Sequence, residues 1–257
     1  MKNRVFISIL ILLAGLMILF LALPIVQWFI SVGPARLAKA FSEAEVLRSI
    51  GLTLGISLAG VFVSAFFGIP LAYLLARHNF RGRSILESII DIPVMIPHTA
   101  AGIALLIAFN RPAVRSVLER AGLSFMDSAL GIMAAMSFLS APLLINGAKE
   151  GFRKVDRRYE KAARTLGASH AGSFFSVAVP IARRDILNGA LMMWSRGLGE
   201  FGAVVVIAYH PMVAPVLIFD RFNSYGVKYS APVAAAMIAV SIIIFLLVRM
   251  LNNRRDI

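Results

Sequence analysis

The chain has 257 residues, of which 59% are hydrophobic and 15% are charged, and its mean hydropathy is +0.83. Because soluble domains carry roughly a quarter charged residues, this composition excludes an ordinary soluble protein and indicates an integral membrane protein. The net charge of +13 does not indicate nucleic-acid binding, because the basic residues lie in short connections between apolar runs and not on one clustered face. The absence of cysteine excludes a disulfide, a thiolate metal site and a thiol nucleophile.

Six apolar segments approach or exceed the roughly 20 residues that a helix needs to cross a bilayer. The expected spans are residues 5–30, 46–76, 85–109, 127–147, 186–209 and 230–250. The first span is longer than the apolar core of about 7–15 residues in a cleaved signal peptide, so we expect it to be retained. The sequence therefore predicts one domain over 1–257, an all-α integral membrane protein with six transmembrane helices.

The third expected span contains Pro93 and Pro97, four residues apart. Proline removes a backbone hydrogen bond and clashes with the preceding turn of a helix, so this spacing predicts a broken or late-starting helix. Within a membrane such a break requires protein or a water-filled cavity beside it, because lipid does not satisfy the freed carbonyls. The alternative is an ordinary kink with no functional role.

Lysine and arginine are distributed unequally between the two sides of the expected bundle. The connections on one side, together with both termini, hold 17 of these residues, and the connections on the other side hold eight. Since cytoplasmic connections are enriched in Lys and Arg, we expect both termini to be cytoplasmic. Arg254 and Arg255 at the C-terminus are part of this count.

Residues 148–184 form the longest polar stretch, and in this orientation they are cytoplasmic. Apolar residues recur in it at spacings of 3, 4, 3 and 4, which predicts one stripe along a helix: Phe152, Val155, Tyr159, Ala162 and Leu166. We expect a short helix over 159–167, ended by Gly167 in the left-handed position that follows many helices. Such a short helix is marginal in water, so it docks on a partner or, alternatively, lies on the bilayer surface.

The same stretch contains Glu160-Lys161-Ala162-Ala163, then Gly167, then Val177-Ala178-Val179-Pro180. It resembles the EAA loop of ABC-type importer permeases, which has an acidic residue, paired alanines, a glycine soon after and a hydrophobic-Pro pair further on. The position directly before the alanines, usually Glu in that family, is Lys161 here, and the acid is Glu160. We therefore assign no specific salt bridge to either residue.

Two further segments extend the resemblance. Trp194–Ala203 looks like the fifth-span signature of the branch that imports tetrahedral oxyanions, namely molybdate, tungstate and sulfate, and Asp91–Gly102 looks like the third span of that branch. The resemblance implies the type I ABC importer permease fold and a subunit that carries molybdate or tungstate into the cytoplasm, with sulfate or thiosulfate as the alternative cargo. An ATP-independent channel or secondary transporter is a further alternative, for which we would expect inverted repeats or intramembrane acids for ion coupling.

The resemblance also implies partners. The chain would pair with itself as a homodimer, bind two cytosolic ABC ATPase subunits, receive cargo from an extracytoplasmic oxyanion-binding protein, and lie in contact with lipid in the plasma (inner) membrane of a prokaryote. Contact with the ATPase is expected at Tyr159, Glu160, Ala162, Ala163, Leu166 and Gly167. ATP and Mg would be bound by the ATPase, because the chain has no G-x-x-x-x-G-K-[ST] phosphate loop. The chain alone is not expected to be an enzyme, with no catalytic residue, no metal, no cofactor and no bound nucleic acid.

Arg196 and Glu200 lie inside the fifth expected span, four residues apart, a spacing at which helical side chains meet. Each would cost roughly 2.5–3.5 kcal/mol at the centre of a lipid-facing helix, so we expect burial against protein or a cavity. Three interpretations stay open. The two residues form an internal ion pair that fixes packing, or Arg196 draws an oxyanion along a path while Glu200 tempers its affinity, or they lie at a dimer interface.

Other polar and small residues accompany this pair. Ser140 and Thr99 are further candidates for the translocation path, whereas His98, at an expected helix start, is interpreted as hydrogen-bonded structure. Glycines near Arg196 are expected to allow close helix approach, as small residues do in membrane bundles: Gly197, Gly199 and Gly202.

Overall fold

The computed structural model describes residues 2–253, and every regular element in that range is helical. The chain order is α1 (Lys2–Ser42), α2 (Ala44–Arg77), α3 (Arg83–Met95), α4 (His98–Phe109), α5 (Pro112–Arg120), α6 (Ala129–Lys154), α7 (Arg157–Thr165), α8 (His170–Ser173), the π-helix η1 (Phe174–Ala178), α9 (Val179–Leu198), α10 (Gly202–Ile207), α11 (Ala214–Tyr225) and α12 (Val227–Asn253). The all-α prediction is confirmed for this part of the chain.

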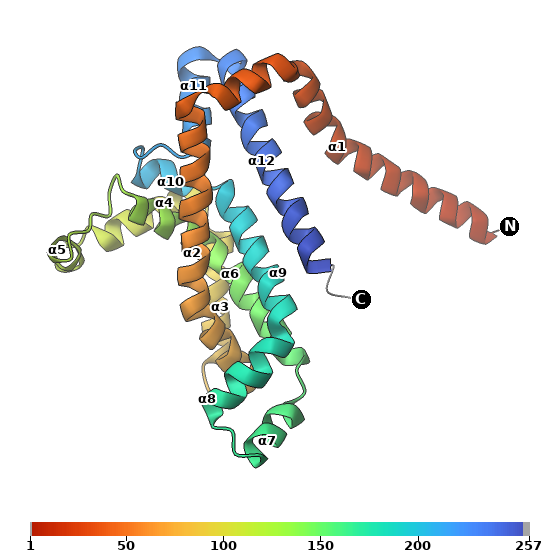
Figure 1. Ribbon diagram of the computed structural model, residues 1–257, viewed down its shortest axis with the longest axis vertical. Helices are drawn as coiled ribbons and strands as arrows, with labels where there is room; N and C mark the ends of the chain where they lie inside the picture. Colours follow the sequence, from red (N-terminus) through yellow and green to blue (C-terminus); the bar gives the residue numbers. More distant parts are fainter. Residues whose placement is uncertain (1, 254–257) are drawn as a thin grey trace.

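Helices α2, α6 and α9 form the centre of the bundle and lie side by side in Figure 1. Glycines let their backbones approach closely, as is common between membrane helices. A Cβ atom on Gly189 of α9 would lie 3.1 Å from the Leu144 carbonyl oxygen of α6, and one on Gly60 of α2 would lie 2.5 Å from the Ser137 hydroxyl. The three helices therefore approach one another closely at positions where glycine leaves no side chain between their backbones.

A buried row of hydroxyl groups ties α2 to two other helices. Ser49, Thr53 and Ser57 are each at most 2% exposed and follow one another by one turn. The Thr53 hydroxyl accepts a hydrogen bond from the Ala214 backbone N–H of α11 at 2.8 Å, and the Ser57 hydroxyl accepts one from the Trp194 indole of α9 at 2.9 Å. Each hydroxyl also donates to a carbonyl of its own helix, so no buried polar group in the row lacks a partner.

Helix α1 leaves the bundle and projects away from it (Figure 1). Its chain direction changes at Gly33, where φ is 71°, a conformation that residues with a Cβ rarely adopt. None of its most apolar window is buried within the molecule. A helical segment that is apolar on all sides and not buried by its own chain is suited to lipid or to another protein surface.

Four helices are long and apolar enough to cross a membrane, namely α1, α2, α6 and α12. Helices α3 and α4 together form a fifth candidate, bent by 116° at Ile96–Pro97, which confirms the predicted break beside the two prolines. The expected span 186–209 is not one helix, because α9 ends at Leu198 and α10 begins at Gly202. Length and composition thus support four or five spans among residues 2–253, and the six expected stay a prediction.

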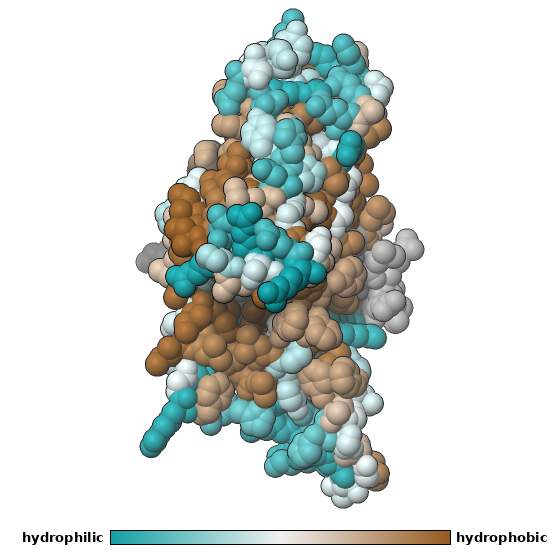
Figure 2. Space-filling view, turned by 90° about the vertical axis from the view of Figure 1, so that its left-hand side faces the viewer, coloured by the Kyte–Doolittle hydropathy of each residue, from teal (hydrophilic) through white to brown (hydrophobic). Residues whose placement is uncertain are grey.

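The surface agrees with a membrane location. Figure 2 shows hydrophilic residues toward the two ends of the long axis and in one patch near mid-height, and hydrophobic residues over much of the remaining surface between the ends. Helices α7 and α8 lie at one end, and α11 with the junction of α1 and α2 lies at the other (Figure 1). Arg254 and Arg255, which contribute to the expected orientation, lie outside the described residues.

Candidate functional site

Helix α7 is the short helix predicted in the polar stretch. Its first turn is capped by Asp156, whose carboxylate accepts a hydrogen bond from the Arg158 backbone N–H at 2.8 Å. It ends at Thr165, and Gly167 follows with φ of 95°, the left-handed conformation expected after a helix. Ser169 caps the next helix, because its hydroxyl accepts a hydrogen bond of 3.0 Å from the Gly172 backbone N–H.

The flanking helices reach further into the polar stretch than expected. Helix α6 continues to Lys154 and α9 begins at Val179, so the connection between these two helices comprises residues 155–178, within the predicted cytoplasmic stretch 148–184. Phe152 and Val155 are buried at the end of α6, against α2, η1 and α9. The expected stripe from Phe152 to Leu166 is therefore wrong, because a helix boundary at Val155–Asp156 separates its two halves.

The apolar residues of α7 lie on its outer face. Tyr159, Ala162, Ala163 and Leu166 follow the i, i+3, i+4, i+7 pattern of one helical face, and Tyr159 is 59% and Leu166 89% exposed. An apolar face left in the open is the inverse of the usual arrangement in a folded domain. Exposed apolar surface of this kind marks a protein or membrane contact.

Glu160 lies on the opposite face and points into the protein. Its carboxylate is 2.5 Å from the Arg77 guanidinium and accepts a hydrogen bond of 2.5 Å from the Tyr73 hydroxyl, both on α2. Ser173 donates to the Glu160 carbonyl at 3.3 Å, and Arg157 donates to the Arg77 carbonyl at 2.6 Å. Glu160, predicted as an ATPase contact, thus attaches α7 to the end of α2.

A second cluster, formed by His98, Arg196 and Glu200, joins the break between α3 and α4 to the break between α9 and α10. Arg196 at the end of α9 lies with Nη1 3.1 Å from the Glu200 carboxylate, which confirms the meeting of this i, i+4 pair. Its Nη2 lies 2.5 Å from His98 Nε2 at the start of α4, and His98 Nδ1 lies 3.1 Å from Glu200. Because a guanidinium only donates hydrogen bonds, Nε2 accepts, which leaves the proton of a neutral ring on Nδ1, beside the carboxylate.

Glu200 is 1% exposed, and it also accepts a hydrogen bond of 3.0 Å from the Ala203 backbone N–H of α10. The side chains of Arg196 and His98 are about two-fifths exposed, at 37% and 42%. The cluster therefore has a buried negative part and an accessible positive part. His98, interpreted from the sequence as structural, is a member that sequence reasoning did not connect to the pair.

Close approach at this cluster depends on one of the three glycines named from the sequence. A Cβ atom on Gly202 would lie 2.7 Å from His98 Cβ, whereas one on Gly197 would make ordinary contacts and one on Gly199 would meet nothing within 4 Å. Ser140 and Thr99, the two remaining candidates for the translocation path, differ in their exposure. Ser140 is buried and donates to the Met136 carbonyl of its own helix, and Thr99 is exposed next to His98.

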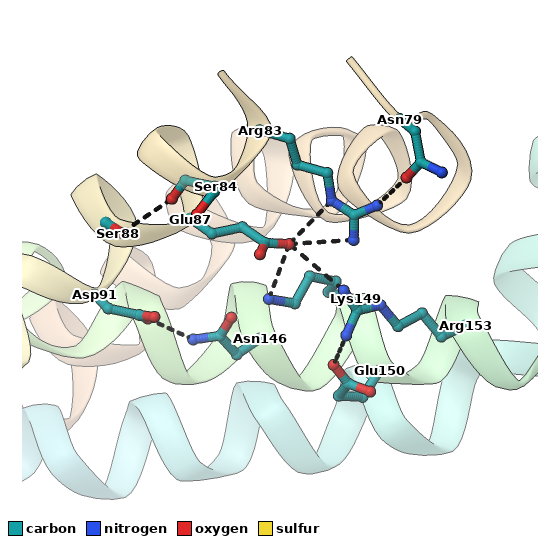
Figure 3. A network of polar contacts seen from close by, with 10 residues as sticks. All are labelled: Asn79, Arg83, Ser84, Glu87, Ser88, Asp91, Asn146, Lys149, Glu150 and Arg153. Carbon is teal, nitrogen blue, oxygen red and sulfur yellow. Dashed lines mark hydrogen bonds and ion pairs between the residues drawn. The ribbon is translucent and has the colours of Figure 1, made fainter. Parts of the chain in front are cut away.

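A third polar group lies between α3 and α6 (Figure 3). Glu87 of α3 is its centre, because one carboxylate oxygen lies 3.3 Å from Arg83 and 3.5 Å from both Lys149 and Arg153. One turn further on, Asp91 accepts a hydrogen bond of 2.7 Å from the Asn146 amide. We call this contact between α3 and α6 the seam. Because Lys149 is only 8% exposed, the Glu87 carboxylate in the seam compensates its positive charge more than solvent does.

The sequence contained a partial signal for this seam. Arg83, Glu87 and Asp91 recur every four residues, which places them on one face of a helix. The basic residues of α6 had been used only as indicators of membrane orientation. Their partner on α3 could not be identified from helix periodicity, because 62 residues separate Glu87 from Lys149.

At the opposite end of the molecule, Arg221 of α11 holds the junction of α1 and α2. Its guanidinium lies 2.8 Å from Glu43 and 2.7 Å from Glu45. Partial burial opposes the charged form of Arg221, but the hydrogen bonds to the two carboxylates outweigh it and raise the pKa of the guanidinium. This end therefore carries a rigid, charge-paired surface.

The chain is similar along almost its entire length to known transport proteins. The molybdate/tungstate transport system permease protein WtpB of Pyrococcus abyssi is 40% identical over 94% of this chain and 94% of its own. That of Methanocaldococcus jannaschii is 33% identical over 92% and 93%. The sulfate transport system permease protein CysT of Synechococcus elongatus is 27% identical over 91% and 87%.

Solved structures share the fold at lower identity. A chain of a bacterial ABC transporter involved in the import of the acidic polysaccharide alginate superposes with a TM-score of 0.75 at 17% identity, over 99% of this chain and 98% of that one. A chain of the MetNI methionine ABC transporter, in an inward-facing conformation, gives 0.61 at 18% identity over 81% and 93%. The family described as binding-protein-dependent transport system inner membrane component matches residues 68–257, and the chain belongs to this family.

Proposed function

We propose that the chain is the permease subunit of an ATP-driven importer that carries molybdate or tungstate into the cytoplasm. The main support for this proposal is the similarity of the chain, over nearly its whole length, to permeases named for molybdate and tungstate. Relatives named molybdate/tungstate permeases are 33% to 40% identical over at least 92% of this chain, whereas those named sulfate permeases reach 27% to 30%. Sulfate is therefore the second candidate cargo.

The importer needs energy from a separate subunit. We propose that two cytosolic ATPase subunits, which bind ATP and Mg, dock on the outer face of α7 in a homodimer of this chain. The exposed Tyr159 and Leu166 supply the apolar contact, and the paired alanines supply room for close backbone approach. The buried contact of Glu160 with Arg77 then transmits displacement of α7 to α2, because a buried ion pair resists separation more than an exposed one.

The cargo path is proposed to pass the cluster of His98, Arg196 and Glu200. A tetrahedral dianion attracts the guanidinium, whose side chain is 37% exposed, while the carboxylate that neutralises it is 1% exposed and out of reach. The attraction is thus moderated, which suits a path that has to release what it binds. Thr99, exposed beside His98, is proposed to offer a neutral donor, whereas Ser140 is proposed to serve packing.

The membrane arrangement follows from this function. We propose six crossings, in which the broken pair α9 and α10 forms the fifth, with both termini and α7 in the cytoplasm of a prokaryotic cell. An extracytoplasmic oxyanion-binding protein would deliver cargo to the end that carries α11. The unequal distribution of Lys and Arg supports this orientation.

The test is uptake of tungstate by the reconstituted complex. The full chain, its ATPase and its binding protein are assembled in proteoliposomes, and internal tungsten is measured by mass spectrometry with and without ATP. We expect ATP-dependent uptake that unlabelled molybdate suppresses and an equal concentration of sulfate does not. Uptake suppressed by sulfate alone would assign the second cargo, and uptake without ATP would refute the proposal.

A further inference from the structure

The face of α7 opposite its apolar residues carries more positive charge than its contacts require, with Glu160 buried and the three cations exposed. Arg157, Glu160, Lys161 and Arg164 occupy this face at the i, i+3, i+4, i+7 positions, opposite Tyr159 and its apolar neighbours. Glu160 is neutralised by Arg77 at 2.5 Å. Three cations therefore share the face without a negative charge of their own.

None of these three cations has a carboxylate partner within residues 2–253. Arg157 donates only to the Arg77 carbonyl, and Arg164 lies 3.5 Å from His170 Nε2, a group that is itself cationic when protonated. The Lys161 backbone carbonyl accepts a hydrogen bond from the Thr165 hydroxyl, and the Lys161 ammonium forms no ion pair with a carboxylate of the described residues. Clustered cations without counterions repel one another, which an anion between them would relieve.

A cavity of about 180 Å³ lies among these side chains. Its walls come from three helices, α2, α7 and α8. The lining has one carboxylate, Glu160, which is paired with Arg77, and three further cationic side chains, Arg157, Lys161 and Arg164, together with Tyr73, His78, His170 and Ser173. The Arg77 side chain is 7% exposed, and its Nε has no hydrogen-bond partner. An unpaired donor on a buried guanidinium is costly and is rarely left unsatisfied in folded proteins.

We propose that this cavity binds a small tetrahedral oxyanion with two negative charges. Guanidinium and ammonium donors from different directions match an anion whose oxygens point to the corners of a tetrahedron. The bound anion would bridge α7 to α2 and α8 and hold the helix in its observed position. The occupant is a free anion and not a carboxylate of the ATPase, because the cavity lies on the face of α7 opposite the exposed apolar one.

Two sources supply such an anion, namely the imported oxyanion after release and inorganic phosphate. Tungstate as a probe rests on the proposed function, whereas phosphate does not. Binding of each to the purified full-length chain in detergent is measured by equilibrium dialysis, with tungsten or phosphorus determined by mass spectrometry. The tighter of the two ligands identifies the source, and either one supports the site.

The variants are Lys161→Gln and Arg164→Gln, each of which removes one charged donor and keeps the length of the side chain. We expect each to weaken binding about tenfold, the effect of losing one hydrogen bond to a charged group. The matched control is Arg158→Gln, on the same helix but with its side chain 91% exposed and only a 4.0 Å contact to Asp156. This control should bind like the unaltered chain.

Three results would overturn the site. Equal binding in all variants would place the anion elsewhere, and equal weakening by Arg158→Gln would reveal only a diffuse positive surface. Unchanged anion binding with lost ATPase copurification in Lys161→Gln would assign the cations to the ATPase interface. Failure of tungstate transport with intact, Lys161-dependent phosphate binding would refute the proposed function and leave this site standing.

Discussion

Replacement of Glu160 by glutamine is the most direct test of how α7 is attached to the bundle. Glutamine keeps the size of the side chain and an acceptor for the Tyr73 hydroxyl, but it removes the negative charge beside Arg77. The side chains of Arg77 and Glu160 are only 7% and 11% exposed, so the guanidinium would remain buried without its counterion.

Breaking a buried ion pair by removing one partner costs about 3–5 kcal/mol. The cost would fall on the contact between α7 and α2, which the Glu160–Arg77 pair and the Tyr73 hydrogen bond join; α7 also packs against α8 and η1. A loss of 3 kcal/mol corresponds to a shift of more than about 100-fold in the equilibrium between attached and detached helix. The bundle of α2, α6 and α9 does not use this pair and should stay folded.

The assay is the ratio of ATP hydrolysed to tungstate imported by the reconstituted complex. Glu160→Gln should raise this ratio strongly, since ATPase movements would no longer reach α2. The matched control is Glu119→Gln, the same substitution in an exposed pair with Arg115, whose side chains are 57% and 63% exposed. Exposed pairs contribute about 0–1 kcal/mol, so this control should leave the ratio unchanged.

A second variant keeps the reasoning testable if Glu160→Gln proves unstable. Replacing Arg77 and Glu160 together by methionine removes both charges, and such exchanges of a buried pair are often neutral or stabilising. This double variant should recover much of the attachment. If Glu160→Gln and Glu119→Gln behave alike, or if the double variant is worse than the single one, the role assigned to the buried pair is wrong.

Further predictions concern the outer face, the cluster and the glycine contacts. Tyr159→Ser should change the free energy of unfolding by no more than about 0.5 kcal/mol, as is typical of surface positions, but it should lower ATPase copurification. Full retention of the ATPase would contradict the proposed docking face. Arg196→Gln should reduce tungstate uptake roughly tenfold while the dimer persists on size-exclusion chromatography; equal loss of dimer would assign Arg196 to packing instead. Gly189→Ala should destabilise the bundle by about 1–3 kcal/mol through overpacking, because its Cβ would lie 3.1 Å from a carbonyl oxygen. Gly199→Ala, with open space around it, is its control, and equal thermal unfolding of the two would refute the close contact.

Local features of the structure could be predicted from the sequence. The break near Pro93 and Pro97, the short helix before Gly167 and the cap at Ser169 depend on residues within a few positions of one another. Their steric and hydrogen-bonding preferences act within a single turn. The approach of Arg196 to Glu200 could be expected for the same reason, because the two are four residues apart in sequence, and it is present although α9 ends at Leu198, before Glu200.

The number of spans was harder to predict, because apolar length alone does not reveal an interruption. Residues 186–209 are apolar enough to suggest one span, yet α9 ends at Leu198 and the chain turns before Gly202. The turn lies in a tightly packed place, since a Cβ atom on Gly202 would lie 2.7 Å from His98 Cβ of α4. A helix propensity is too weak to predict such a termination when neighbouring helices impose it.

The sequence by itself determined that this protein is an apolar, all-helical membrane protein with a short helix in a polar loop, a helix break at two prolines and a charged pair four residues apart. These properties follow from composition and from local residue spacing. Only the tertiary structure decided which face of α7 turns outward and which partners the charges meet. Glu160 meets Tyr73 across 87 positions, and Arg196 meets His98 across 98. Helical periodicity relates residues one turn apart, whereas such distant contacts depend on which helices pack together and where each one ends.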